Sequence, residues 1–339
     1  MSKDFDSSGV QSIALILIGR LGDYLVTTPF IRAMRERFPK AYIALLTSTK
    51  AKEPALLNNN LSKVHIFHNW LNLAADIKMI GFFTKKYDIA IDLNPAYSRT
   101  SLGIIAALKS PEKITFKKKA FSKVCNRLID NSSDTEHFSD KYERLAALFG
   151  AACRQQMEME IPAVALKKAD ELLAGILAVD GRVNIAIHPG NFKKTGHRWP
   201  EEKFVEFTKK LLSDPRLNVF YLTGPGEEKI TAANILRFLP AVKSLPPRPL
   251  TEVAAILKKI DFFVCNNTGT LHLCAAVGTP TFSFNTQYSL KNWKPKGEKH
   301  FYLAGEWGSC RMIPVESAIS EFYKSLKALS LLRACGKII

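Results

Sequence analysis

The chain has 339 residues, of which 47% are hydrophobic, so it can bury a large core and is expected to form two domains rather than one. Its longest apolar runs, such as Ile13 to Ile18, are far shorter than the roughly 20 residues that span a bilayer. The first residues also lack the basic and apolar regions of a signal peptide. We therefore expect a globular protein of the cytoplasm.

The charge and the cysteines narrow the class of protein. Forty-eight Lys and Arg against 31 Asp and Glu give a formal charge of +17, which favours nucleic acid, an acidic membrane surface or a phosphorylated substrate as partner. Zinc-finger, RRM and KH motifs are absent from the sequence, so nucleic acid is the least expected of the three. The six cysteines show no metal-ligand spacing, and Cys265 and Cys274 are predicted to be free thiols of the core.

The N-terminal half alternates predicted strands with predicted helices. The strands are expected over residues 12–18, 41–46, 64–67, 88–93 and 113–116. The helices are expected over residues 24–38, 71–85, a short segment ending near residue 109, and 137–149. Pro29 is expected to kink the first helix or to mark its start, and residues 116–135 are predicted to form an exposed loop.

A linker is predicted over residues 157–162, after which the alternation begins again. Helices are expected over residues 167–177, 200–212, 227–238 and 250–259, and strands over residues 184–188, 218–222, 262–265 and 281–284. Two such runs predict an α/β protein with two doubly wound parallel sheets facing each other across a cleft. A last helix, within residues 315–339, is expected to pack back on the first domain.

The stretch from Asp261 to Pro280 predicts a strand, a tight turn and a helix. Such a junction directs backbone N–H groups and the positive end of a helix dipole at the strand's carboxyl end, where a phosphate can bind. His272 falls in the first turn of this helix and is expected to face the same place. A purely structural junction is the alternative, because every α/β protein contains several.

The loop from Gly19 to Asp23 also joins a strand to a helix, but it lacks the spacing of both the dinucleotide and the P-loop motifs. It supplies a carboxylate, Asp23, that can accept a proton from an incoming hydroxyl. An N-terminal helix cap is an equally good interpretation of this aspartate.

Two more strand ends carry candidate ligand-binding residues. The first is followed by a glycine and several cations, which suit a diphosphate: Gly190, Lys193, Lys194, His197 and Arg198. The second is followed by Gly224 and by Glu227 and Glu228, either of which can accept hydrogen bonds from ribose hydroxyls. A solvated basic loop and ordinary helix-dipole chemistry are the alternatives. Their joint occurrence strengthens a binding site, because ligands of open α/β sheets bind at strand ends.

In combination, these motifs resemble glycosyltransferase family 9, the heptosyltransferases that build the inner core of lipopolysaccharide. The resemblance runs from Ile13 to about Asn285 and includes Leu21-Gly-Asp23, Thr28-Pro29 with Arg32 and Ala33, residues 87–92, His188-Pro-Gly190, Trp199-Pro200, the loop from Gly224, and Asn267 to Pro280. It implies the GT-B fold. Residues 1–160 would carry the acceptor site and residues 161–314 would bind an ADP-sugar.

The resemblance also implies roles for single residues. Asp23 would be the general base of an inverting transfer, and Glu227 the ribose contact. Thr268, Gly269, His272 and the loop of residues 191–198 would hold the diphosphate, so neither a metal nor a further cofactor is expected. The sequence departs from the family at Asn267, where an aspartate is usual, and at His197, where a lysine is usual. Because Asn267 lacks the charge of the usual aspartate, the sequence does not determine which sugar the donor carries.

An anionic glycolipid at the cytoplasmic face of the inner membrane is the expected acceptor. The candidate residues that would bind it are Arg20, Arg99, Lys117, Lys118 and Lys119, although a solvated basic face is as good an interpretation of each. The leading hypothesis is heptose transfer from ADP-heptose to the lipopolysaccharide inner core. A GT-B transferase for another nucleotide sugar, or a catalytically silent protein that binds nucleotide sugars or anionic glycans, are the alternatives.

Overall fold

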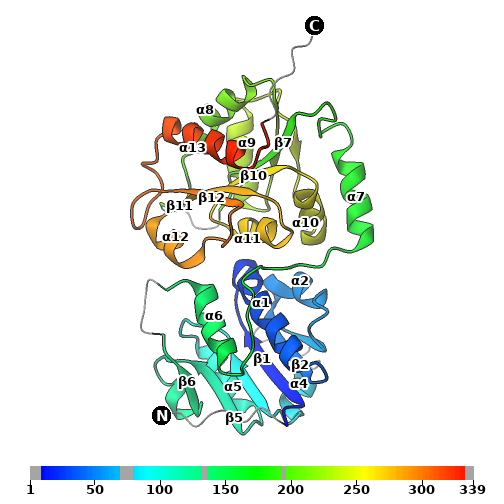
Figure 1. The fold of residues 1–339 in the computed structure, drawn as a ribbon, viewed down its shortest axis with the longest axis vertical. Coiled ribbons are helices and arrows are strands. Elements are labelled where there is room, and N and C mark those ends of the chain that lie inside the picture. The colour runs from blue at the N-terminus through cyan, green and yellow to red at the C-terminus, as the bar shows by residue number, and fades with distance from the viewer. Residues whose placement is uncertain (1–8, 69–78, 132–135, 192–195, 333–339) are drawn as a thin grey trace. The chain divides into compact units, whose positions relative to one another are not determined.

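The computed structural model describes residues 9–68, 79–131, 136–191 and 196–332, apart from the side chain of Glu227. The chain divides into two compact units, Met1–Glu160 and Ile161–Ile339. Over the described residues each unit has one six-stranded sheet in which all paired strands are parallel. Helices connect the strands of both sheets (Figure 1), which confirms the predicted α/β class.

The N-terminal sheet has the strand order β3-β2-β1-β4-β5-β6. Its strands are β1 (Ser12–Leu17), β2 (Tyr42–Ser48), β3 (Lys63–Phe67), β4 (Ile89–Asp92), β5 (Glu112–Phe116) and β6 (Arg127–Ile129). Its helices are α1 (Leu21–Arg37), α2 (Lys52–Leu56), α4 (Ile80–Thr84), α5 (Arg99–Ala107) and α6 (Phe138–Ala147), with short 3-10 turns at Thr49–Ala51 and Phe121–Lys123. Because the chain leaves β1 toward β2 and later returns to β4, a topological switch point lies between β1 and β4.

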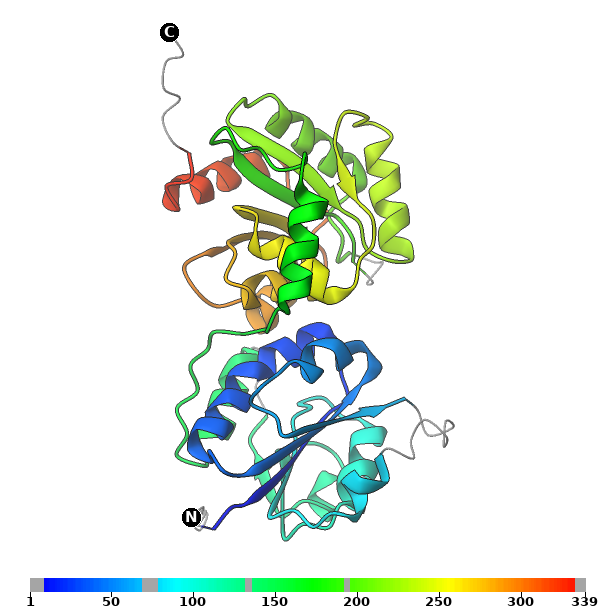
Figure 2. The same ribbon diagram turned by 90° about the vertical axis from the view of Figure 1, so that its right-hand side faces the viewer.

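The C-terminal sheet repeats this order as β12-β11-β10-β7-β8-β9, with its switch point between β7 and β10. Its strands are β7 (Val183–His188), β8 (Leu217–Leu222), β9 (Ser244–Leu245), β10 (Phe262–Asn266), β11 (Thr281–Asn285) and β12 (His300–Ala304). Its helices are α7 (Ala163–Leu173), α8 (Glu201–Leu212), α9 (Glu227–Leu236), α10 (Leu250–Lys258), α11 (Gly269–Ala276), α12 (Gln287–Trp293) and α13 (Val315–Ala328). Helices α7 and α10 lie side by side (Figure 2).

Helix α1 contains Pro29 in its interior and begins at Leu21, earlier than the predicted Tyr24. Proline has no N–H to donate to the carbonyl four residues before it, which here belongs to Leu25. The hydroxyl of Thr28 donates to that carbonyl instead, at 2.8 Å. The helix therefore continues through the proline, and Asp23 lies in its first turn.

Helix α13 packs in the C-terminal domain, so the prediction that it returns to the N-terminal domain is wrong. Ala318, Phe322 and Leu326 form its buried stripe in the core between α8 and the sheet. The Phe322 ring meets Phe207 at 5.5 Å and Phe262 at 5.6 Å between centroids. A stripe with helical spacing shows that a helix buries one face, but it does not show against which sheet.

Several short elements were not predicted. Residues 127–129, expected in a loop, form β6, while β9, α2, α12 and β12 have no counterpart among the predicted elements. Most of the helix predicted over residues 71–85 lies outside the described residues, and its end is α4.

Candidate functional site

The loops after β7 and β10 are bound together at the switch point of the C-terminal sheet. The side-chain amide of Asn191, just after β7, donates to the carbonyl oxygens of His197 at 2.9 Å and Asn267 at 3.0 Å. Asn266, at the end of β10, donates to the Pro189 carbonyl at 2.7 Å and accepts from the Trp199 N–H at 2.9 Å. These bonds fix both loops where open α/β sheets bind their ligands.

The predicted strand, turn and helix at the centre of this site are confirmed. Strand β10 ends at Asn266, and α11 begins at Gly269 with Thr268 as its N-cap. The Thr268 hydroxyl accepts from the Thr270 N–H at 3.2 Å. The first N–H groups of a helix have no acceptor within it and carry the positive end of the dipole, so this turn can bind an anion. His272 is buried in α11, with its ring 6.3 Å from that of Trp293.

A buried carboxylate, Glu228 of α9, is one of the two glutamates predicted from the sequence as a ribose contact, and it lies at the ends of β7 and β8. Its side chain is packed against two glycines, so that a Cβ atom on Gly190 would lie 2.7 Å from Glu228 Cγ, and one on Gly224 would lie 1.9 Å from Glu228 Oε2. His188 Nε2 lies 3.7 Å from the same oxygen, while His188 Nδ1 pairs with the Leu222 carbonyl at 2.9 Å. The two glycines at successive strand ends are the sequence signal for this close approach.

The structure describes only some of the other residues predicted to bind the donor. Arg198 Nε donates to the Asn191 carbonyl at 2.6 Å, which ties the guanidinium to the loop's own backbone. Lys193 and Lys194 lie outside the described residues, as does the side chain of Glu227. Trp199 is buried and stacks on Phe284 at 4.0 Å between ring centroids, and Pro200 is the N-cap of α8.

Asp23 lies at the switch point of the N-terminal sheet, in the first turn of α1. Arg20, not Asp23, is the N-cap of this helix, and Asp23 is its third residue. The Oδ2 of Asp23 accepts from the Arg20 N–H at 2.6 Å, so the carboxylate caps the helix from inside its first turn. An ionised carboxylate has about four lone-pair sites, and this bond leaves capacity to accept a proton from another group. Gly19 makes room for the side chain, since a Cβ atom there would lie 2.8 Å from Asp23 Cβ.

A second carboxylate, Asp92 at the end of β4, is fully buried. Its oxygens accept from the Asn94 side chain at 2.6 Å and from Lys118 Nζ at 2.6 Å. Tyr142 lies close to both carboxylates: burial raises its pKa well above the ordinary value, and the charges of Asp23 and Asp92 add to the rise. Its phenol donates to the Leu93 carbonyl at 2.9 Å.

Lys118 therefore differs from the two lysines beside it. Its side chain is only 5% exposed, and burial lowers the pKa of its ammonium group while the charge of Asp92 opposes that shift. The predicted acceptor role of Lys118 is corrected accordingly, because its ammonium group is engaged by the Asp92 carboxylate and the Asn94 carbonyl within the domain. Arg20, Arg99, Lys117 and Lys119 are exposed.

Three further properties concern the described residues as a whole. The five cysteines among them are free thiols, and burial raises the pKa of Cys265 and Cys274, as expected of core residues. No group of three or more His, Cys, Asp or Glu side chains within the described ranges is placed to hold a metal ion. None of the helices in this part of the chain has the length and hydropathy needed to cross a membrane.

Two doubly wound parallel domains, each with a polar site at its switch point, form the GT-B fold. The family model of glycosyltransferase family 9 (heptosyltransferase) matches residues 81–309, which is more than half of the chain. The chain belongs to this family. It is also 28% identical over 131 residues to a putative glycosyltransferase of Haemophilus influenzae, a match that covers 35% of this chain and 38% of that protein.

Solved structures of the family share the fold over nearly the whole chain. The family 9 glycosyl transferase of Veillonella parvula has a TM-score of 0.78 at 16% identity, covering 94% of this chain and 97% of its own. ADP-heptose lps heptosyltransferase II of E. coli has a TM-score of 0.76 at 16% identity, covering 94% and 100%. E. coli heptosyltransferase WaaC with ADP-2-deoxy-2-fluoro heptose has a TM-score of 0.69 at 17% identity, covering 93% and 99%. At these identities the likeness confirms the fold.

Proposed function

We propose that this chain transfers heptose from ADP-heptose to an acceptor of the lipopolysaccharide inner core. The observation that carries the proposal is the pair of switch-point sites, an anion-binding turn at Thr268 in one domain and a half-buried carboxylate, Asp23, in the other. Membership of family 9 supports the reaction class, and the similarity to heptosyltransferases that bind ADP or an ADP-heptose analogue supports the donor.

The reaction we propose is a single inverting displacement. The acceptor hydroxyl oxygen forms a bond to the anomeric carbon, the bond from that carbon to the diphosphate oxygen breaks, and its electron pair leaves with ADP. Asp23 takes the proton of the hydroxyl. The N–H groups at the start of α11 stabilise the charge that grows on the departing diphosphate, so we propose no metal and no further cofactor.

We assign the ribose contact to Glu228 rather than to its neighbour Glu227. The carboxylate of Glu228 lies at the ends of β7 and β8, one strand from the anion-binding turn, against Gly190 and Gly224. Ribose and diphosphate are adjacent in a nucleotide, so their binding groups are expected at neighbouring strand ends.

A different nucleotide sugar is a second candidate, favoured by Asn267. The backbone of this residue is fixed, because its N–H donates to the Phe284 carbonyl at 3.1 Å and its carbonyl accepts from Asn191. An amide at this position supplies a donor as well as an acceptor where a carboxylate supplies acceptors only. The hydroxyl pattern of the sugar that it accepts can therefore differ.

On the acceptor side, we propose an anionic glycolipid at the cytoplasmic face of the inner membrane. The exposed cations Arg20, Arg99, Lys117 and Lys119 of the N-terminal domain, together with the charge of +17, suit such a partner. Contacts of this kind weaken as the ionic strength rises.

The decisive experiment compares Asp23→Asn with Asp88→Asn in a transfer assay. The asparagine keeps an oxygen for the Arg20 N–H but no longer takes a proton, so kcat should fall by about 10²- to 10⁴-fold. ADP affinity should not change, because the nucleotide site is in the other domain. Asp88 is the matched control: its Oδ2 accepts from the backbone N–H groups of Gln11 and Ser12, at the opposite ends of the strands.

A rate near normal for Asp23→Asn would refute the role of Asp23. The same assay, run with ADP-heptose and with UDP- and GDP-linked sugars, tests the donor. Turnover with a UDP-sugar only would overturn the ADP-heptose assignment and leave the role of Asp23 standing.

A further inference from the structure

Three side chains of the C-terminal domain form an exposed surface that the proposed reaction does not yet use. They are Tyr288 and Lys291 of α12 and Trp307 in the loop after β12, here called the Trp307 platform. Trp307 is 53% exposed and Tyr288 36%. Their ring centroids are 5.9 Å apart at an interplanar angle of 70°, and Lys291 Nζ lies 5.3 Å from the Trp307 centroid.

The backbone beneath the Trp307 platform is firmly held. The N–H of Gln287 donates to the Glu306 carbonyl at 2.9 Å, and the N–H of Tyr288 donates to the Trp307 carbonyl at 3.2 Å. Helix α12 begins with a buried pair, Thr286 and Ser289, whose side chains each bond to the backbone of the other. An exposed tryptophan on a fixed backbone loses little further freedom when a ligand covers it.

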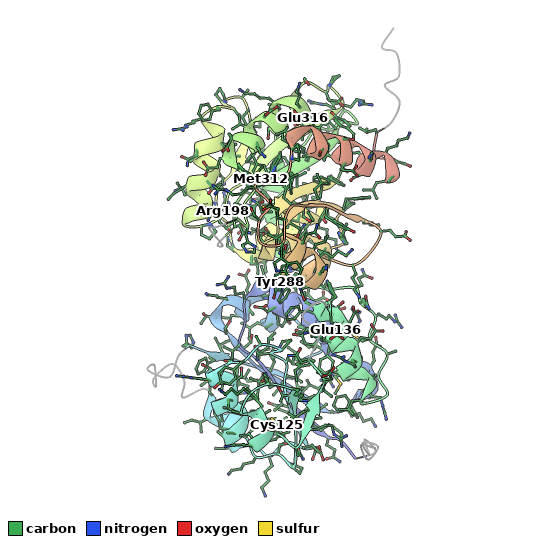
Figure 3. The ribbon with its side chains drawn as sticks, turned by 90° about the vertical axis from the view of Figure 1, so that its left-hand side faces the viewer. Cys125, Glu136, Arg198, Tyr288, Met312 and Glu316 are labelled. Carbon is green, nitrogen blue, oxygen red and sulfur yellow. The ribbon has the colours of Figure 1, made fainter. Side chains whose placement is uncertain are left out.

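The Trp307 platform lies beside the candidate donor site. Tyr288 follows β11, which pairs with β10, and Trp307 follows β12, which pairs with β11, so both lie at the carboxyl ends of the strands, as the anion-binding turn does. The loop that carries Trp307 is joined to the loop after β7, because the Cys310 N–H donates to the Gly196 carbonyl at 2.7 Å. In Figure 3, Tyr288 is at the opposite end of this domain from Glu316 of α13.

The order of these sites along the carboxyl ends of the strands indicates which part of the substrates the Trp307 platform contacts. Glu228 lies at β7 and β8, the turn at Thr268 follows β10, and the platform follows β11 and β12. A nucleotide sugar bound with its ribose at Glu228 and its diphosphate at Thr268 extends its sugar toward β11. The acceptor glycan, which receives the donor sugar, then lies beyond that sugar, toward the Trp307 platform.

We infer that the Trp307 platform binds a sugar residue of the acceptor that carries a phosphate or carboxylate group. A sugar ring has an apolar face of C–H groups that can pack on one of the two inclined rings, and hydroxyls at its rim that stay in water. Lys291, whose Nζ lies over the Trp307 ring, supplies a positive charge beside it for the anionic group. This inference rests on the proposed function, because it takes the acceptor to be an acidic glycan.

The experiment measures binding of a deacylated, phosphorylated inner-core oligosaccharide by ligand-observed NMR, and the acceptor and donor KM by transfer assay. Trp307→Ala should weaken oligosaccharide binding and raise the acceptor KM by about tenfold or more, as loss of a central aromatic contact does. Trp307→Phe should restore most of the binding. Lys291→Ala should weaken binding of the phosphorylated oligosaccharide but not of the same oligosaccharide after phosphatase treatment.

Phe238→Ala is the matched control. Phe238 is 54% exposed, and the Arg237 guanidinium lies over its ring at 4.8 Å from the centroid. It lies between α9 and β9, and β9 is the outermost strand on the side of the sheet opposite β12. If Trp307→Ala binds the oligosaccharide like Phe238→Ala, the inference is wrong. A raised donor KM with an unchanged acceptor KM would assign the platform to the donor sugar and overturn it as well.

Two further outcomes separate this inference from the proposed function. Platform-dependent oligosaccharide binding by a protein that transfers no sugar would support the platform and refute the reaction. Loss of binding to vesicles of anionic phospholipid by Trp307→Ala, with oligosaccharide affinity unchanged, would show that the platform contacts lipid and would overturn the inference.

Discussion

The position of Glu228 depends on two residues that have no side chain. Its carboxylate is 5% exposed, and it occupies the space that a methyl group would take at Gly190 or Gly224. Each glycine follows a strand of the sheet, so the backbone turns that present N–H groups to a ligand also admit the carboxylate. The geometry of this single side chain is thus set by both strand ends.

Replacing Gly224 with alanine tests this arrangement. The new methyl carbon would lie 1.9 Å from Glu228 Oε2 and 2.8 Å from Glu228 Cβ, so both the carboxylate and the first turn of α9 that carries it should move. One lost charge-assisted hydrogen bond is worth roughly 1.5 to 3 kcal/mol, so the Kd for ADP should rise about tenfold or more. Isothermal titration calorimetry measures it.

Gly81→Ala in α4 is the control for that change, since a Cβ atom there meets nothing within 4 Å. Equal ADP affinity in the two variants would show that Glu228 does not contact the nucleotide.

At the scale of residues, the sequence predicted where residues lie in the fold better than which groups their side chains contact. The placement of Asp23 after β1 and of Thr268 at the start of α11 followed from strand-to-helix patterns. The choice between Glu227 and Glu228 did not, because both begin α9 and only the three-dimensional approach to two glycines distinguishes them. Lys118 was predicted with its neighbours for the same reason: three consecutive lysines look alike until the backbone shows which one points inward.

At the scale of elements, a buried ion pair holds the ends of β4 and β5 together. Lys118, just after β5, donates to Asp92 at the end of β4 and to the Asn94 carbonyl, and its ammonium group lies 4.2 Å from the Phe121 ring centroid. Thr115 of β5 adds a bond to Asp92 at 3.2 Å. This network fixes the loop after β4 to the end of β5.

Lys118→Ala should destabilise the N-terminal domain. It leaves the fully buried Asp92 carboxylate without its cation, a change that costs about 3 to 5 kcal/mol when one partner of a buried pair is removed. Lys119→Ala, at an exposed position one residue away, should change stability by no more than about 0.5 kcal/mol. Urea unfolding followed by circular dichroism measures both. Equal stability of the two variants would show that the pair contributes nothing.

The strength of a local pattern decided which elements were predicted. Buried strands such as β1 and β10 and amphipathic helices such as α8 have long apolar patterns and were predicted within a few residues. Strands β6 and β9 are too short to show an alternating hydrophobic pattern in the sequence, and both are edge strands of their sheets. Helix α1 passed through Pro29 because Thr28 supplies the missing hydrogen bond, a compensation that helix propensities do not include.

At the scale of the whole molecule, the chain repeats one architecture twice with separate cores. The same strand order is built in each half, and among the described residues one apolar cluster of the N-terminal half and one of the C-terminal half share no residue. The repeat of βα units was sufficient to predict this organisation. The location of α13 was not predictable, because its buried stripe fits either sheet by pattern alone.

Phe322→Ala tests the assignment of α13 and the independence of the two cores together. The ring is fully buried among Phe207, Phe262 and Phe282, so its removal should destabilise the C-terminal domain by about 3 to 5 kcal/mol. ADP binds the folded C-terminal domain in our proposal, so it should raise the melting temperature of that domain only. In differential scanning calorimetry, the transition that Phe322→Ala lowers should therefore be the one that ADP raises. Were the substitution to lower a transition that ADP leaves unchanged, either the helix or the nucleotide would be assigned to the wrong domain; retained ADP binding by the isolated residues 161–339 would place the error in the helix.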